Sequence, residues 1–356
     1  MICAFRVDAG AEIGAGHVMR CMVLAAALKD HGASVTFICR RMPGDMIQFV
    51  RDHSFDAVEL PDGEPRSRGC TVPSEDIWQQ DAVETAAVLE HVQPHLLVVD
   101  HYQLDVRWER HIAPFTARLM AIDDLANRPH DCDIVLDQNL KCGGAHGYDS
   151  LVPQRCIQLL GPGYALVRSE FTTLRSQAIE RRKGPGMQRL LVSMGGSDPT
   201  DETGRAIAAV RAAATRWKHI DVVVGASYVH TDRLRHALEN LPAQLHVQTS
   251  DMARLMLDAD FGITASGSTS WEKCVLGLPS LAVAVADNQF PIAKALHERG
   301  AHIMLDGLSP HACRYSESLE SMTPSIAKSM SDNAFEVCDG LGASRVTRRI
   351  LDQVSA

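Results

Sequence analysis

The chain has 356 residues, of which 46% are hydrophobic, 22% charged and 5% aromatic, and its formal net charge at pH 7 is −9. This length predicts about two domains, and the composition is typical of a soluble α/β protein. The acidic balance argues against a nucleic acid or an anionic membrane as a partner held by bulk charge. No apolar run reaches the ~18 residues that a membrane span needs, and no secretion signal opens the chain, so we expect a cytoplasmic protein.

The 10 cysteines are scattered, with no Cys-x-x-Cys pair and no zinc-type spacing. Most of them lie in apolar runs, which predicts reduced core residues. We therefore expect neither a structural metal nor a disulfide framework.

Strand-like and helix-like segments alternate along the chain, which indicates parallel sheets with crossover helices. In the first half, the expected strands are 3–8, 34–39, 96–100, 119–122, 133–136 and 156–159. The expected helices there are 17–30, 44–53, 76–91 and 105–112. Residues 61–73 are rich in Gly, Pro and Arg, which predicts a surface loop.

A second series of strands begins near residue 190. The expected strands are 190–193, 220–224, 245–248, 261–265 and 281–285, with a helix between each pair. In the first of these helices, which runs to about Arg216, Asp198 fits the N-cap and Pro199 the first helical position. Residues 181–188 resemble a hinge, and a helix is expected over 344–354.

Both halves thus open with a strand, a glycine loop and a helix. We expect an α/β protein of two Rossmann-like domains that face each other across a cleft. The N-terminal domain would cover residues 1–165 and the C-terminal domain residues 166–335. Residues 336–356 contain the last helix. One arrangement that the pattern allows is that this helix packs back on the N-terminal domain.

The first candidate site is the loop between the first strand and the first helix. Gly14 and Gly16 let a ligand approach the backbone, and His17 and Arg20 lie three residues apart in the first helical turn. An imidazole at this position can transfer protons near pH 7. The alternative is a helix-start histidine that bonds only its neighbours.

The second candidate site is the segment 266–272, rich in small and hydroxyl residues at a helix start. Ser268 and Thr269 could donate to a diphosphate, and Glu272, one turn further, could accept ribose hydroxyls. An ordinary capped helix is the alternative. The pair Gly195-Gly196 after the strand 190–193 indicates close backbone approach by a ligand.

Two other kinds of site have weaker support. Asp100-His101 and Asp123-Asp124 could suggest a metal, but acids at strand ends also cap loops, and no His-x-His or His-x-x-Glu motif supports it. A nicotinamide enzyme needs a glycine fingerprint with an acid about 20 residues later, and that fingerprint is missing. We expect no cofactor.

Several ordered motifs resemble a bacterial sugar-nucleotide hydrolase family of pseudaminic acid biosynthesis, over about residues 1–300. Members of this family hydrolyse UDP-2,4-diacetamido-2,4,6-trideoxy-β-L-altropyranose. The family is similar in fold to glycosyltransferases with two Rossmann domains, the GT-B type. The matching motifs are Arg6-Val7-Asp8, Ile13-Gly14-x-Gly16-His17-x-x-Arg20-Cys21, His101-Tyr102, Ile122-Asp123-Asp124-Leu125-Ala126, Asp137-Gln138-Asn139, Gly161-Pro162-x-Tyr164-Ala165-Leu166, Met194-Gly195-Gly196-Ser197-Asp198-Pro199, Ser266-Gly267-Ser268-Thr269-x-Trp271-Glu272 and Asn288-Gln289.

The resemblance implies a UDP-sugar bound between the domains without a metal. It implies that His17 positions and deprotonates a water molecule and that Gly14 and Gly16 shape its loop. Ser268 and Thr269 would contact the diphosphate, Glu272 the ribose and Met252 the uracil. The other residues expected to bind the nucleotide-sugar are Arg20, Gly195, Gly196, Asn288 and Gln289. The stretch 9–12 departs from the family by lacking a small polar residue such as serine.

The reaction expected from this resemblance is cleavage of the anomeric C–O bond by water, with inversion, in a monomeric enzyme. A glycosyltransferase on the same fold is the first alternative, since the same site could admit an acceptor and exclude water. A binding protein without catalytic activity is the second, and His17 and Glu272 argue against it.

Overall fold

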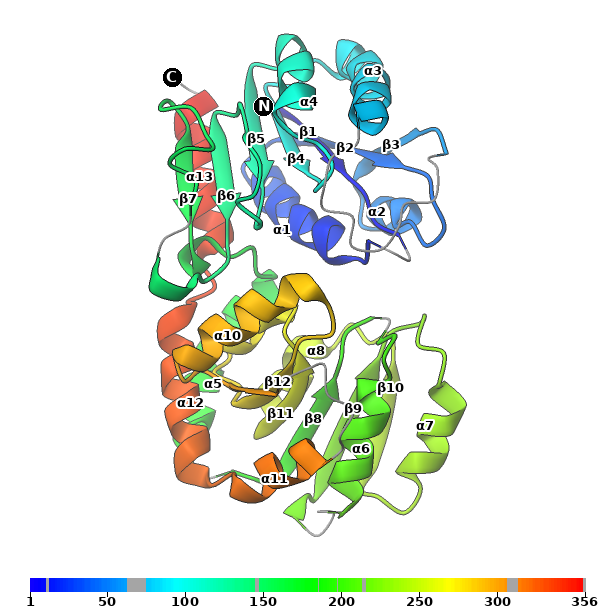
Figure 1. Ribbon diagram of the computed structural model, residues 1–356, viewed down its shortest axis with the longest axis vertical. Coiled ribbons are helices and arrows are strands. Elements are labelled where there is room, and N and C mark those ends of the chain that lie inside the picture. The colour runs from blue at the N-terminus through cyan, green and yellow to red at the C-terminus, as the bar shows by residue number, and fades with distance from the viewer. Residues whose placement is uncertain are drawn as a thin grey trace. The chain divides into compact units, whose positions relative to one another are not determined.

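The computed structural model describes residues 1–10, 13–62, 75–144, 147–184, 186–196, 198–212, 216–305 and 313–354. Ala11, Glu12, Ser197 and most of the expected loop 61–73 lie outside these described residues. The chain divides into two compact units (Figure 1). Unit 1 comprises Met1–Asn139, Gly144–Leu166 and Leu341–Ala356, and unit 2 comprises Leu140–Gly143 and Val167–Gly340.

Unit 1 is built on a seven-stranded parallel sheet with the order β3-β2-β1-β4-β5-β6-β7. Its strands are β1 Ile2–Val7, β2 Ser34–Arg40, β3 Asp56–Leu60, β4 Leu96–Asp100, β5 Arg118–Ile122, β6 Ile134–Asp137 and β7 Ile157–Leu160. Its helices are α1 Gly16–Asp30, α2 Ile47–Asp52, α3 Glu75–Val92, α4 Val106–Ile112 and α13 Gly342–Val354. The last helix, α13, packs against α1 in this unit.

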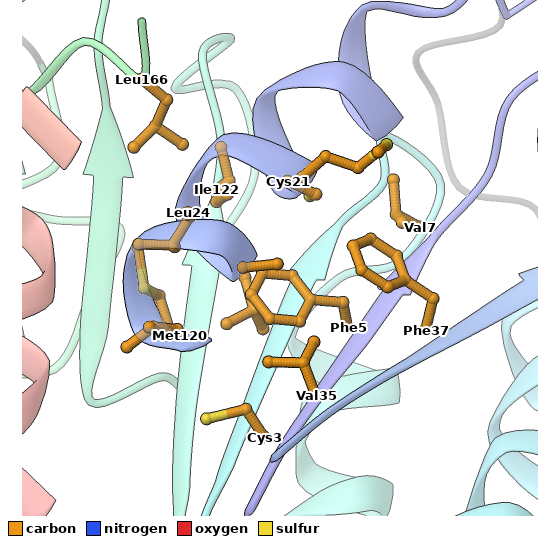
Figure 2. Packing of buried hydrophobic residues seen from close by; sticks show 14 of the residues in the cluster. Cys3, Phe5, Val7, Cys21, Leu24, Val35, Phe37, Met120, Ile122 and Leu166 are labelled. Carbon is orange, nitrogen blue, oxygen red and sulfur yellow. The ribbon is translucent and has the colours of Figure 1, made fainter. Parts of the chain in front are cut away.

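The sheet of unit 1 is covered on both faces, which explains why its strands read as continuous apolar runs. One face packs against α1, α2 and α13, and the other packs against α3 and α4. Figure 2 shows the first of these cores, in which the stacked rings of Phe5 and Phe37 lie 5.2 Å apart. Each fully buried side chain of this kind contributes about 1.5–3 kcal/mol, so the sheet provides a rigid base for the loops at its edge.

Unit 2 has a six-stranded parallel sheet with the order β10-β9-β8-β11-β12-β13. Its strands are β8 Arg189–Ser193, β9 His219–Val224, β10 Ala243–Val247, β11 Phe261–Ala265, β12 Ser280–Val283 and β13 Ile303–Leu305. Its helices are α5 Ser169–Arg181, α6 Glu202–Ala212, α7 Thr231–Leu238, α8 Met252–Asp258, α9 Thr269–Val275, α10 Phe290–Glu298, α11 Cys313–Ser321 and α12 Pro324–Val337. Both sheets confirm the expected α/β class with two parallel-sheet domains.

The start of α6 and two edge strands differ from what the sequence predicted. Helix α6 begins at Glu202, so Pro199 is not its first residue. Asp198 adopts a positive φ of 39°, and its carboxylate reaches over a turn to accept from the amides of Glu202 and Thr203 at 2.9 and 2.8 Å. The short edge strands β3 and β13 were not expected from the sequence.

Within the described part of the chain, no helix combines the length and apolarity that crossing a bilayer requires.

Candidate active site

The strand order of unit 1 locates its candidate site. The order reverses between β1 and β4, which are neighbours in the sheet, with Val7 paired to Asp100. In open parallel sheets, ligands bind beyond the carboxyl ends of the strands at such a reversal point. The loop after β1 leads into α1 and carries His17, while Asp100 ends β4. The fold therefore brings together two residues that are 83 positions apart.

His17 and Asp100 form a short hydrogen bond. The Nδ1 atom of His17 lies 2.6 Å from Oδ1 of Asp100, a separation that requires a proton between them, so Nδ1–H donates to the carboxylate. The neutral ring then carries its lone pair on Nε2. The ring is 9% exposed, and its edge packs against the ring of Tyr102 with centroids 4.7 Å apart. This arrangement suits a general base.

Arg20 holds the same carboxylate. Its Nε and a terminal nitrogen each donate to Asp100 at 2.6 Å, and its second terminal nitrogen donates to Asp124 at 2.8 Å. Burial alone would raise the pKa of Asp100, but Arg20 and then His17 outweigh it and hold that pKa well below its usual range. Asp100 is thus ionised at neutral pH, and the guanidinium of Arg20 is engaged by two carboxylates.

His17 differs from the other buried histidines of unit 1 in its partners. His101 directly follows the end of β4; its Nδ1 accepts from the Gln103 amide at 3.1 Å and its Nε2 lies 3.3 Å from Asp8. The Nδ1 of His130 lies 2.6 Å from Glu109. The Nε2 of His130 also lies 3.8 Å from Asp123, so both nitrogens of each of these two rings face buried polar groups, which favours a structural role.

The glycines before His17 shape the loop. Gly14 has a φ of +83°, a conformation that favours glycine, and its amide donates to the Gly10 carbonyl at 2.7 Å. Gly16 begins α1, and both Gly14 and Gly16 are exposed. A side chain at either position would point into open space, so the glycines keep the backbone beside His17 accessible.

In unit 2 the strand order reverses between β8 and β11. Gly195 and Gly196 follow β8, and Gly195 has a φ of +87°. The loop after β9 supports this turn, because Ser227 Oγ donates to the Gly196 carbonyl at 3.0 Å. A β-carbon at Gly225 would lie only 2.1 Å from that carbonyl oxygen, so glycine is required there. Sequence reasoning did not identify Gly225.

The segment after β11 contains several buried polar atoms without a hydrogen-bond partner among the described residues. Ser268 is exposed and Thr269 begins α9. Glu272 accepts from Arg168 Nε at 2.8 Å through Oε1 only. The buried atoms without a partner in this segment are Ser266 Oγ, Ser270 Oγ, Trp271 Nε1 and Glu272 Oε2. Since buried polar groups are almost always paired, such a concentration indicates a binding segment.

Three further candidate residues lie in the segments that follow β10 and β12. Met252 is the first residue of α8 and is half-buried. Asn288 is exposed, and Gln289 accepts from the Val285 amide at 3.1 Å through Oε1. The Nε2 atom of Gln289 lies beside Gly267, 3.4 Å from the position that a β-carbon on residue 267 would occupy. The loops that carry these residues therefore lie at the same edge of the sheet as Ser268.

Sequence reasoning considered Asp100 only as a possible metal ligand, and it gave no individual role to Arg168, Ser266 or Ser270. The strand order could have indicated Asp100. Because the order of the sheet reverses between β1 and β4, the end of β4 lies beside the loop after β1. Arg168 has no comparable signal, since a contact 104 residues away cannot be read from local pattern.

Comparison with curated proteins identifies three relatives, while no family model matches the chain. An uncharacterized protein of Methanocaldococcus jannaschii is 22% identical over 78% of this chain and 54% of its own length. The UDP-2,4-diacetamido-2,4,6-trideoxy-beta-L-altropyranose hydrolase of Campylobacter jejuni is 25% identical over 84% of this chain and 97% of its own length. The spore coat polysaccharide biosynthesis protein SpsG of Bacillus subtilis is 27% identical over 54% of this chain and 57% of its own length. The chain thus spans little more than half the length of two of these three relatives.

Solved structures agree on the fold. MurG of Acinetobacter baumannii has a TM-score of 0.69 at 12% identity, covering 99% of both chains. The glycosyltransferase SsfS6 of Streptomyces sp. SF2575, complexed with thymidine diphosphate, has a TM-score of 0.63 at 14% identity, covering 99% of both chains. The resemblance inferred from the motifs is thereby confirmed: the chain is similar to the UDP-diacetamido-altropyranose hydrolase and has the two-domain fold of the GT-B glycosyltransferases.

Proposed function

We propose that this protein is a UDP-sugar hydrolase that cleaves UDP-2,4-diacetamido-2,4,6-trideoxy-β-L-altropyranose to the free sugar and UDP, in pseudaminic acid biosynthesis. The observation that carries the proposal is the hydrogen bond between His17 and Asp100, which leaves Nε2 of the imidazole as a base. The similarity to the Campylobacter jejuni hydrolase supports the substrate class.

In the proposed reaction, a water oxygen forms a bond to C1 of the sugar while the C1–O bond to the diphosphate breaks. The proton of the attacking water moves to Nε2 of His17, and the electron pair of the broken bond leaves with UDP. General-base catalysis of this kind contributes ~10²–10⁴ in rate. Direct attack opposite the leaving group inverts the configuration at C1.

The charge of Asp100 supports the base in two ways. The carboxylate fixes the ring in the tautomer whose lone pair is on Nε2, and it stabilises the imidazolium that forms when the proton arrives. Arg20, engaged by Asp100 and Asp124, acts in this proposal by holding the carboxylate in place. This role differs from the direct contact to UDP expected from the sequence.

Unit 2 would bind the UDP group. The hydroxyls of Ser268 and Thr269 are proposed to donate to the diphosphate, with Gly195 and Gly196 allowing it to approach the backbone. The unpartnered Oε2 of Glu272 is proposed to accept a ribose hydroxyl. Uracil near Met252, and sugar contacts by Asn288 and Gln289, complete the proposed site.

A glycosyltransferase using a UDP-amino sugar is the second candidate, because the solved structures with this fold include glycosyltransferases. The two activities differ in what attacks C1. Incubation with a panel of UDP-diacetamido sugars and no acceptor distinguishes them. We expect UDP and free sugar to be released in equal amounts. If none of the sugar nucleotides in the panel releases UDP, the proposed hydrolysis is contradicted.

The bond that breaks can be identified in the same reaction run in ¹⁸O-labelled water. Cleavage of the C1–O bond leaves UDP unlabelled, whereas attack at phosphorus places ¹⁸O in UDP, which mass spectrometry detects. NMR of the first-formed anomer reports inversion or retention. Dialysis against EDTA should leave the rate of hydrolysis unchanged, because hydroxyl groups and backbone N–H groups, rather than a metal ion, are proposed to bind the leaving diphosphate.

A further inference from the structure

Arg168 lies beside the carboxylate that is proposed to bind the ribose. It immediately precedes α5, and its Nε donates to Glu272 Oε1 at 2.8 Å, while a terminal nitrogen lies 2.8 Å from Glu170 Oε1. Its guanidinium stacks over the buried ring of Phe171, 4.8 Å from the ring centroid. Ion pairing and stacking together fix the orientation of this side chain.

Glu272 has one satisfied oxygen and one unsatisfied oxygen. Its side chain is 11% exposed, Oε1 is bound by Arg168, and Oε2 is buried with no hydrogen-bond partner among the described residues. Leaving one oxygen of a buried carboxylate unpaired is costly. The arrangement therefore presents an acceptor that a ligand hydroxyl can satisfy.

The charge state of Glu272 depends on its cationic neighbour. Burial raises the pKa of Glu272, Arg168 opposes this rise, and Glu170 adds to it. The adjacent Lys273 cannot replace Arg168, because its Nζ donates instead to Thr264 at 2.7 Å, inside the unit. Without Arg168, the carboxyl would bind a proton more readily as the pH falls.

Protonation changes what Glu272 can recognise. An ionised carboxylate only accepts hydrogen bonds, which matches the two hydroxyl donors of a ribose diol. A protonated carboxyl presents one donor and loses part of its acceptor capacity. We propose that Arg168 is a positioning residue that sets the preference of this site for ribonucleotides by orienting Glu272 as an acceptor. This inference rests on the proposed function, which assigns the ribose to Glu272.

The experiment compares the affinities for UDP and 2′-deoxy-UDP by calorimetry between pH 5.5 and 8. Charge-assisted hydrogen bonds predict that the wild type prefers UDP by about tenfold or more. In Arg168→Met the preference should fall to about threefold or less at pH 5.5 and recover in part at pH 8, as Glu272 ionises. Arg168→Lys keeps a cation at this position and should retain more of the preference for UDP than Arg168→Met does. If Arg168→Met does not fold, Arg168→Lys still allows the comparison with the wild type.

Two controls separate the possible failures. Glu272→Gln should lose the preference at every pH, and Arg181→Met, which removes another arginine–carboxylate pair of α5, should keep it. If Arg168→Met weakens both nucleotides equally and keeps their ratio and its pH dependence, Arg168 acts otherwise and the inference is overturned. If the wild type itself shows no preference for UDP, the ribose assignment within the proposed function has failed instead.

Discussion

The Nδ1 atom of His17 donates to Oδ1 of Asp100 across 2.6 Å. His17 lies in the first turn of α1, which follows β1, and Asp100 ends β4, the strand that pairs with β1 in the sheet. Asp100 is fully buried, carries a negative charge and is also held by Arg20. The pair has the properties of a base whose tautomer is fixed before substrate binds.

Replacing Asp100 with Asn should therefore impair the chemistry and not the binding. The variant keeps the size of the side chain but loses the charge that stabilises the imidazolium. We expect kcat to fall on the order of 10²-fold or more, with the Kd for UDP unchanged within about twofold. Steady-state kinetics and calorimetry measure the two quantities. Asp30→Asn, at the exposed end of α1, is the control that should retain full activity.

The glycine after β9 tests the support of the loop that carries Gly195 and Gly196. Gly225→Ala places a methyl group where the Gly196 carbonyl now lies, so the loop must move. We expect the affinity for UDP to fall about tenfold, the equivalent of one charge-assisted hydrogen bond. Gly184→Ala, whose β-carbon would meet its neighbour at an ordinary 3.7 Å, should bind UDP normally. Normal binding by both variants would exclude this loop from the nucleotide site.

The buried charges beneath the site of unit 1 test how the sheet edge is stabilised. Arg6 is fully buried and pairs with Asp8 at 2.5 Å and Asp81 at 2.5 Å. Arg6→Ala leaves two buried carboxylates without this partner and should lower the free energy of unfolding by about 3–5 kcal/mol. Arg51→Ala removes the exposed pair with Glu59 and should cost less than about 1 kcal/mol. Urea unfolding measures both, and equal costs would contradict the role assigned to burial.

His130 makes the stability of unit 1 depend on pH. Burial alone would lower its pKa, but Asp123 and Glu109 outweigh burial and raise the pKa to about 9, against 6.5 for an ordinary histidine. Since the folded state binds the proton more tightly, the stabilisation is fully present below about pH 6.5 and is lost as the pH rises through about 9. The difference in unfolding free energy between wild type and His130→Gln should shrink by about 3 kcal/mol between pH 6 and 9.5. A constant difference would show that folding does not shift the pKa of His130.

Local pattern predicted most of the framework of this protein. Continuous apolar runs such as β4 and β11 were predicted with their observed bounds, because strands buried on both faces leave a strong signal. The edge strands β3 and β13 were missed: β3 has two charged residues among its five, with no regular alternation, and β13 has only three residues. At Asp198, a residue with positive φ moved the helix start by several positions, which propensity does not capture.

Those parts of the candidate site that depend on local sequence features could be predicted. Glycine loops and a histidine after an apolar strand are local features, so His17 and the segment near Ser268 could be chosen from the sequence. The partner of His17 and the partner of Glu272 depend on strand order and on contacts over long separations. Sequence reasoning assigned Arg20 to the ligand and did not predict its ion pairs with Asp100 and Asp124.

The role of His17 is tested most directly by comparing turnover with binding in His17→Asn. The matched control is His31→Asn, which changes an exposed histidine just beyond the other end of α1. We expect His17→Asn to bind UDP with the wild-type Kd while its release of UDP from the UDP-diacetamido sugar falls at least ~10²-fold, with His31→Asn unchanged in both. Wild-type turnover in His17→Asn would contradict the assignment of the imidazole as the base that activates water.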